Sequence, residues 1–197
     1  MKIERVYREI LHRVLDLNSG EIIKQKKLSD ACGIAISVVN YALKPLEEMN
    51  TIEKKPFGFR VINPKKILLY WASIRKLRKD IIYQTFVDKP VEDIESSLPQ
   101  VVFTAYTAYK LRFKSVPSDY SEVIVYGDEN VKERFVLNKG MGPNLIVLKC
   151  DEHLKKFAVT PMAQIFVDLW NLKTWYANEF VKALEGKIDG ILERYSY

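Results

Sequence analysis

Cysteine and histidine are scarce in this sequence. Two cysteines, Cys32 and Cys150, and two histidines, His12 and His153, stand far apart in 197 residues. The cysteines form no CxxC pair, so the sequence indicates neither a disulfide framework nor a zinc site, and we expect both thiols to be buried. There is no Gly-rich phosphate loop, and no Ser-His-Asp or Cys-His arrangement can be assembled from the spacing. We therefore expect no metal, no cofactor and no enzyme activity.

Long hydrophobic runs are also missing. No stretch approaches the roughly 18 uncharged apolar residues of a membrane span, and the N-terminus lacks the apolar run of a signal peptide. We expect a cytoplasmic protein that does not contact a membrane. The composition is balanced, with 48% hydrophobic and 28% charged residues. This balance is typical of a globular protein, and the length favours two small domains.

Positive charge is concentrated in the first half of the chain. Residues 1–90 contain 18 Lys and Arg against 10 Asp and Glu, a net charge of +8. Residues 91–197 contain 13 against 15, a net charge of −2. Clustered cations gain free energy by releasing counterions from nucleic acid, although a basic surface is often only hydrated. The asymmetry suggests a half that binds a polyanion, joined to a half with another task.

The N-terminal third has the pattern of a helix-turn-helix. An amphipathic stripe predicts a helix over 3–17, and a short second helix follows within 24–33. A third helix is predicted over 36–49, with Asn50 in the left-handed conformation after it. Four residues have the spacing of the helix-turn-helix family, namely Leu28, Gly33, Ile34 and Val39. Ser29 replaces the usual alanine, and Pro45 is expected to bend the third helix.

A basic hairpin is predicted next, in "TIEKKPFGFRVIN". A helix followed by such a wing is how winged helix domains hold DNA, with the helix in the major groove and the wing on the flanking backbone. The exposed face of the third helix is predicted to carry Ser37, Asn40, Tyr41 and Lys44, with Asn40 suited to adenine and Lys44 to guanine or phosphate. Phosphate contacts are predicted for the wing and for the start of the second helix, at Lys54, Lys55, Arg60, Lys24, Lys26 and Lys27. The alternative is a winged helix that binds protein.

We predict three parts: a winged helix-turn-helix domain over 1–63, a connecting helix over 64–88 and a C-terminal α/β domain over 89–197. The connecting helix has an apolar stripe that suits either a dimer or packing within the chain, with Ile67, Trp71, Ile74, Leu77 and Ile81 along it. Its other face is basic and could extend the DNA contact, with Lys65, Lys66, Arg75, Lys76, Arg78 and Lys79.

The C-terminal half predicts a helix in "VVFTAYTAYKLRF", strands in "SEVIVYGDE" and "NLIVLKCDE", and helices in "MAQIFVDLWNL" and from Trp175 on. In the first of these helices Val102, Ala105, Tyr106 and Tyr109 are at helical spacing, with small residues suited to close packing. The fold class is therefore α+β, with a small C-terminal α/β domain. Trp170, Trp175 and Tyr176 suit either a ligand pocket or, more commonly, a core.

Several of these segments resemble the AbiEi-like antitoxin family of type IV toxin–antitoxin systems. The resemblance rests on "YWAS", "VVFTAYTAY", the two strands and "VTPMAQIFVDLW" followed by "ANEFVKAL". The last segments contain a family signature, at Pro161, Gln164, Asp168, Leu169, Ala177 and Glu179. An Arg-Gly step of the family is replaced here by "TWYAN". The resemblance implies a winged helix before an antitoxin domain, and autoregulation of an operon shared with a nucleotidyltransferase toxin.

The second half is also similar to a degenerate nucleotidyltransferase scaffold. Such enzymes hold magnesium with carboxylates that alternate on one strand. Glu122 and Asp128 lie outside the predicted strand, and no Gly-Ser step precedes it. The turn after the second strand, which contains Asp151, Glu152 and His153, does not converge on one ion. We therefore do not expect catalysis.

Together these patterns predict a DNA-binding transcriptional regulator, an autoregulatory repressor that occludes a promoter as a homodimer. Its expected partners are double-stranded DNA and a toxin or another protein. The alternative is a protein-interaction module that acts as an antitoxin through its C-terminal domain without binding DNA. A nucleotidyltransferase is the third hypothesis.

Overall fold

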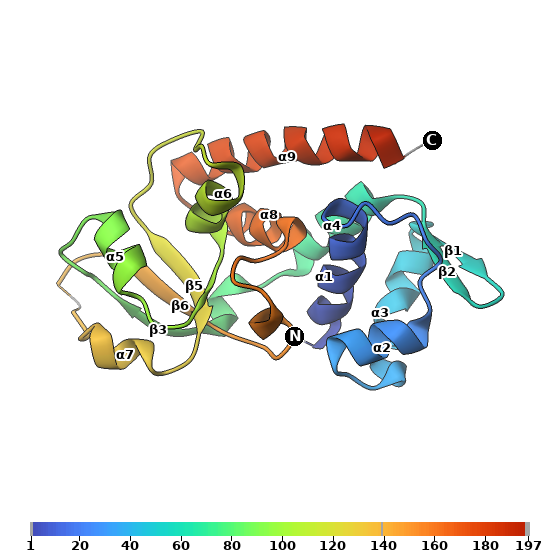
Figure 1. Cartoon of the computed structure of the whole chain (residues 1–197), viewed down its shortest axis with the longest axis horizontal. Helices are drawn as coiled ribbons and strands as arrows, with labels where there is room; N and C mark the ends of the chain where they lie inside the picture. The colour runs from blue at the N-terminus through green and yellow to red at the C-terminus, as the bar shows by residue number, and fades with distance from the viewer. Residues whose placement is uncertain (1, 139, 196–197) are drawn as a thin grey trace. The chain divides into compact units, whose positions relative to one another are not determined.

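The chain divides into two units in the computed structural model, which describes residues 2–138 and 140–195 (Figure 1). The first unit contains the residues up to Arg75, then Pro161–Val167 and the residues from Leu184 on. The second unit contains Lys76–Thr160 and Asp168–Ala183. Helices and two sheets occur together, which confirms the α+β class. Among the described residues, no helix has both the length and the apolarity to cross a membrane.

Three helices open the first unit: α1 (Lys2–Leu15), α2 (Gln25–Cys32) and α3 (Ile36–Glu48). Their apolar stripes form a common core, which buries Val6, Ile10, Leu11, Leu28, Val39, Leu43 and Leu46. Gly33 ends α2 with φ of 61°, and Asn50 follows α3 with φ of 53°, so both predicted left-handed turns are confirmed. These positions fix the tight turn between α2 and α3 and the exit from α3.

The predicted hairpin is confirmed. Strands β1 (Ile52–Lys55) and β2 (Gly58–Val61) pair antiparallel, with Ile52 opposite Val61. Ile23 adds an antiparallel bridge to Phe59 on the outer side of β2. The hairpin buries one face, with Ile52, Phe59 and Val61 all buried. It projects from the helices of its unit (Figure 1).

The prediction of one connecting helix over 64–88 is correct for residues 64–74 and wrong for the residues after them. Helix α4 (Pro64–Ile74) begins at an Asn63 cap, whose side chain accepts a hydrogen bond from the Lys66 N–H at 2.9 Å. The chain then leaves the helix at Arg75 and forms the short 3-10 helix η1 (Leu77–Asp80) and strand β3 (Ile81–Thr85). The β-branched and aromatic residues of β3 pair with a distant strand, and this tertiary pairing overrides the helical period.

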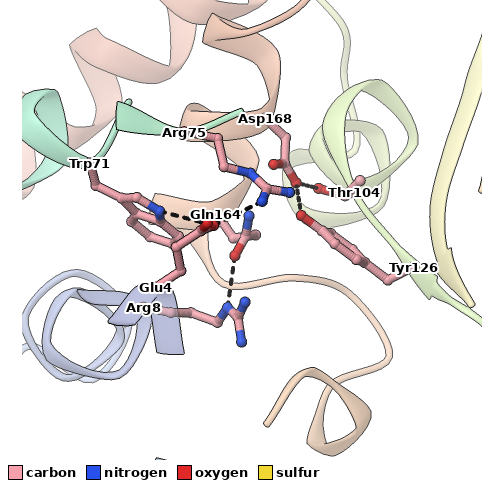
Figure 2. A network of polar contacts seen from close by, with 8 residues as sticks. All are labelled: Glu4, Arg8, Trp71, Arg75, Thr104, Tyr126, Gln164 and Asp168. Carbon is pink, nitrogen blue, oxygen red and sulfur yellow. Dashed lines mark hydrogen bonds and ion pairs between the residues drawn. The ribbon is translucent and has the colours of Figure 1, made fainter. Parts of the chain in front are cut away.

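Arg75 itself was predicted on the exposed basic face and is instead buried. Its Nη1 lies 2.9 Å from the Glu4 carboxylate, and each side chain is only 3% exposed (Figure 2). The Trp71 indole donates to the same carboxylate at 3.4 Å. Separately, the Arg8 Nε donates to the Gln164 side-chain oxygen at 2.7 Å. Arg75 therefore pairs inside the first unit at the residue where α4 ends, and it does not belong to an exposed basic face.

The second unit is built on a four-stranded sheet in the order β3-β6-β5-β4. Strands β5 (Val123–Gly127) and β6 (Leu145–Lys149) are parallel, whereas β3 and β4 (Val102–Phe103) are antiparallel edge strands. One core cluster packs on this sheet and includes Ile94, Val123, Val125, Leu145 and Val147. The remaining elements are α5 (Val91–Ser97), α6 (Ala105–Phe113), α7 (Val131–Arg134), the 3-10 helix η2 (Leu154–Lys156), α8 (Met162–Trp170) and α9 (Trp175–Tyr195).

The two predicted strands and the last two helices of the C-terminal half are confirmed. Strands β3 and β4 were not predicted, and Val102 lies in β4 rather than on the helix that begins at Ala105. Cys32 is buried as predicted, but Cys150 is only half-buried. The preference for a core role is wrong for two aromatic residues, because Trp170 is 48% and Trp175 is 72% exposed.

A second polar network is buried in the second unit. The Thr104 hydroxyl donates to the Asp168 carboxylate at 2.8 Å, and the Tyr126 hydroxyl donates to the same oxygen at 2.7 Å (Figure 2). Asp168 is fully buried. The signature residues of the last helical region are also buried, with Asp168 and Leu169 in the second unit and Pro161 and Gln164 in the first. Their contacts hold elements together, so the structure gives them a role in the fold.

Candidate nucleic-acid interface

Helix α3 presents the predicted recognition surface to solvent. Its buried face carries Val39, Leu43 and Leu46, and the opposite face exposes Ser37, Asn40, Tyr41 and Lys44. Because these four residues are spaced three to four apart, they line one face of the helix. Tyr41 is 65% exposed, so the face combines an amide, a cation and an aromatic ring. These are groups that can reach base edges and phosphates in a major groove.

Pro45 does not interrupt α3, which is continuous from Ile36 to Glu48. The helix is fixed to α1 by the Tyr7 hydroxyl, which donates to the Ala42 carbonyl at 3.1 Å. Burial raises the pKa of Tyr7, so this hydroxyl keeps its proton. The predicted bend near Pro45 stays a prediction. A recognition helix held in this way can present its exposed face with little loss of order on binding.

The wing carries the three predicted cations, two of which are paired with carboxylates. The Lys54 Nζ lies 2.8 Å from the Glu47 carboxylate on α3, and the Lys55 Nζ lies 2.7 Å from Glu53 on the same strand. The hydrogen bond from Lys55 lowers the pKa of Glu53, so this carboxylate is charged at neutral pH. Arg60 is exposed opposite Glu53. Surface ion pairs of this kind are weak, so phosphates can displace the carboxylates.

The start of α2 forms a second basic cluster. Lys24 occupies the N-cap position, and Lys26 and Lys27 are exposed in the first turn. The first turn contains no acidic residue, and the Lys24 side chain makes no capping hydrogen bond. Lys26 pairs with Asp30 one turn further on, at 2.8 Å. The positive end of the helix dipole and the charges of the lysines both favour binding of an anion at the start of α2.

Lys65 and Lys66 of the predicted basic face make contacts within the first unit, whereas Lys76, Arg78 and Lys79 lie beyond α4 and are exposed. The Lys65 Nζ lies 2.8 Å from Asp189 and 3.0 Å from Glu185, and the hydrogen bond to Asp189 raises the pKa of Lys65. The Lys66 Nζ donates to the Met49 carbonyl at 2.9 Å. The apolar stripe of α4 is mostly buried, including Ile67 and Trp71. Most of the stripe therefore packs within the first unit, although Leu69 is 37% exposed.

Phe57 is the prominent residue of this surface that sequence reasoning missed. It lies in the turn between β1 and β2 and is 79% exposed. The signal was present in "KKPFGFR", where an aromatic residue sits at a turn between basic residues. Nothing in that pattern distinguishes Phe57, which faces solvent, from Phe59, which is buried.

The second unit offers a different kind of feature, a cavity of about 550 Å³. It lies where the parallel strands β5 and β6 end, and its lining includes Gly127, Asp128, Cys150, Lys155 and Lys156. Ligands of open α/β sheets commonly bind at the carboxyl ends of strands. In the part of the chain that the structure describes, no group of three or more His, Cys, Asp or Glu residues is suitably placed for a metal ion.

The interface just described falls within a region of recognised family similarity. Residues 3–102, slightly more than half of the 197 residues, match the family described as Firmicute plasmid replication protein (RepL). The chain belongs to the RepL family. No curated protein and no solved structure matches it.

The RepL match begins in α1 and ends in β4, so it contains α3, the wing and the basic start of α2. It fits a DNA-binding module of the winged helix type. The match to RepL does not support the resemblance to the AbiEi-like antitoxins, which stays a prediction. It also ends before β5, β6 and the cavity at their ends, so the comparison says nothing about that part of the second unit.

Proposed function

We propose that the chain binds double-stranded DNA at a specific site and regulates the replication or expression of a plasmid from that site. The observation that supports this most strongly is the pairing of an exposed, polar face of α3 with a rigid basic wing in the same unit. Membership of the RepL family adds replication as the process, because its members are described as plasmid replication proteins.

In this proposal, α3 reads the sequence and the wing supplies affinity. Asn40 makes a bidentate contact to adenine, and Lys44 reaches guanine or a nearby phosphate. Lys54, Lys55 and Arg60 contact the flanking backbone and release counterions, which gives affinity without sequence preference. The lysines at the start of α2 hold one more phosphate.

Repression of its own promoter is the finer proposal. A protein bound across a promoter blocks polymerase, and a homodimer would match a two-fold symmetric site. Most of the apolar stripe of α4 is buried, which favours a dimer surface elsewhere. A dimer or a toxin partner would therefore use other surfaces, among which exposed Trp170 and Trp175 are the largest apolar side chains of the second unit.

Catalysis is not part of the proposal. Glu122 and Asp128 flank β5 instead of alternating along it, and the Tyr176 hydroxyl donates a hydrogen bond to Glu122. This arrangement lacks the pair of carboxylates with which nucleotidyltransferases hold magnesium. The cavity beside Asp128, Lys155 and Lys156 instead supports a regulatory ligand or partner of the second unit. A magnesium-dependent labelling assay with each nucleotide is the test, and incorporation of label would contradict the proposal.

Site recognition is tested by fluorescence anisotropy of the full chain on duplexes that tile the DNA on both sides of its coding sequence. We expect one duplex to bind at least about a hundredfold more tightly than a scrambled duplex of equal length. Asn40→Ala should reduce that preference about tenfold while leaving affinity for scrambled DNA unchanged, because one bidentate base contact is lost. Asn178→Ala, at an exposed position of α9, is the matched control. Equal binding to all duplexes would contradict a role for α3 in recognition.

A further inference from the structure

The tip of the wing exposes an aromatic ring in the middle of a basic surface. Phe57 is 79% exposed, whereas Phe59, two residues later, is 1% exposed. Phe57 follows Pro56, which is exposed too, so the turn itself has an apolar surface. A single exposed apolar residue is common and carries no meaning alone. Its surroundings decide whether it has a role.

The two residues that follow Phe57 are packed against the backbone of Ile23. The Ile23 N–H donates to the Phe59 carbonyl at 2.8 Å, and the Phe59 N–H donates back to the Ile23 carbonyl at 3.0 Å. Gly58 has φ of 154°, and a Cβ on it would lie 2.3 Å from the Ile23 carbonyl oxygen. Only glycine fits at this approach. The ring of Phe57 therefore lies in a turn that is anchored directly after it.

Both strands of the hairpin carry basic residues close to Phe57 in the sequence. Lys54 and Lys55 precede it on β1, and Arg60 follows it on β2. An apolar pocket on a protein partner would bind the ring but would not require the cations. The minor groove of DNA has phosphates along both edges, which bind cations, and stacked base pairs at its floor, which an apolar ring can contact. An apolar tip with cations behind it matches the groove on both counts.

We propose that Phe57 is a wedge that enters the minor groove, inserts between two base pairs and kinks the duplex. This inference rests on the proposed function and adds a deformation of the DNA to it. Insertion of an apolar side chain unstacks one base step and bends the duplex toward the major groove. Pyrimidine–purine steps unstack most readily, so the wedge adds a sequence preference where no hydrogen bond is made.

The test uses the full chain and the duplex that it binds most tightly. One copy of this duplex carries 2-aminopurine at successive positions under the wing, and another carries a donor and an acceptor dye at its two ends. The wild-type protein should increase 2-aminopurine fluorescence severalfold at one step and should increase energy transfer between the ends, as an unstacked and bent duplex requires.

Three variants separate the explanations. Phe57→Ala should abolish both signals and weaken binding about tenfold, and Phe57→Leu, which keeps an apolar wedge, should retain both in part. Val136→Ala truncates an apolar side chain of the second unit that is 83% exposed, and it should behave as wild type. Because Phe57 is exposed, its loss should leave the fold intact, which circular dichroism checks.

The outcomes distinguish this inference from the proposed function. If the wild-type protein binds a duplex tightly and Phe57→Ala retains the fluorescence and energy-transfer changes, the wedge is wrong and the DNA-binding function stands. The wedge is also wrong if Phe57→Ala binds as tightly as wild type and the wild type leaves the duplex straight. If the wild-type protein binds no duplex, the proposed function fails and the wedge fails with it.

Discussion

Both units bury a polar network, but the first unit also exposes a polar face. In the first unit Glu4, Arg8 and Arg75 are buried, whereas Asn40, Tyr41 and Lys44 on α3 are exposed beside the basic wing. In the second unit Asp168 is fully buried, with the hydroxyls of Thr104 and Tyr126 on its carboxylate. Residues 1–90 carry the whole excess of positive charge, and this range contains α3, the wing and the start of α2.

This comparison distinguishes residues that can contact a ligand from residues that stabilise the fold. Exposed polar groups on a helix can leave water for a ligand at little cost, whereas a buried carboxylate with two donors is costly to disturb. The antitoxin-like signature at Gln164 and Asp168 therefore belongs with the fold, and the candidate site belongs with residues that make few contacts inside the protein.

Asp168→Ala should have the largest effect, because it leaves two buried hydroxyls without their acceptor. We expect the free energy of unfolding to fall by about 3 kcal/mol. Asp168→Asn keeps an acceptor at the same place and should cost less. Urea denaturation followed by circular dichroism measures both, and a loss under about 1 kcal/mol for the alanine variant would show that the buried network contributes little.

Gly58→Ala should come second, because its Cβ would meet the Ile23 carbonyl oxygen at 2.3 Å and φ of 154° is unsuited to alanine. We expect a loss of about 2 kcal/mol of stability, together with weaker DNA binding through a displaced wing. Gly186→Ala is the matched control, since Gly186 lies in α9 with nothing within 4 Å of its added Cβ. That variant should be stabilised by about 0.5–1 kcal/mol and should bind DNA normally.

Glu47→Gln should have the smallest effect on stability. It should strengthen DNA binding, whereas Gly58→Ala should weaken it. The Glu47 substitution frees Lys54 from its ion pair and removes a negative charge near the phosphates, so affinity should rise about threefold at low salt. Stability should change by less than about 0.5 kcal/mol, because surface ion pairs are weak. Glu152→Gln breaks a comparable pair with Lys155 in the second unit and should leave DNA affinity unchanged. An equal increase in DNA affinity in the two variants would show that the wing is no closer to the DNA than the second unit is.

Sequence patterns predicted the first unit better than the second for a physical reason. The helices of the first unit follow from local periodicity, which also fixes the exposed face of α3. Strand β3 was missed because Ile74, Leu77 and Ile81 continue a helical period, while its partner β6 lies far along the chain. Strand β4 contains only Val102 and Phe103, too few residues for a pattern.

The sequence predicted which residues belong to the candidate site, but it did not predict the contacts that these residues make. Helical spacing was enough to place Ser37, Asn40 and Lys44 together. The pairing of Lys54 with Glu47 joins two elements and requires their tertiary placement, which spacing does not contain. The outward orientation of Phe57 depends on the anchoring of its neighbours to Ile23, which a turn pattern does not reveal.

The salt dependence of DNA binding tests the central claim most directly. The wild-type chain is compared with a wing variant, in which Lys54, Lys55 and Arg60 are alanine. A control variant has alanine at Lys132, Lys155 and Lys182, three lysines of the second unit that also pair with nearby glutamates.

The logarithm of the binding constant is plotted against the logarithm of salt concentration for each protein. The wing variant should lose about 2.7 units of slope, close to 0.9 for each phosphate contact, while the control keeps the wild-type slope. If the wing variant keeps the wild-type slope, or both variants lose it equally, the wing is not the DNA contact.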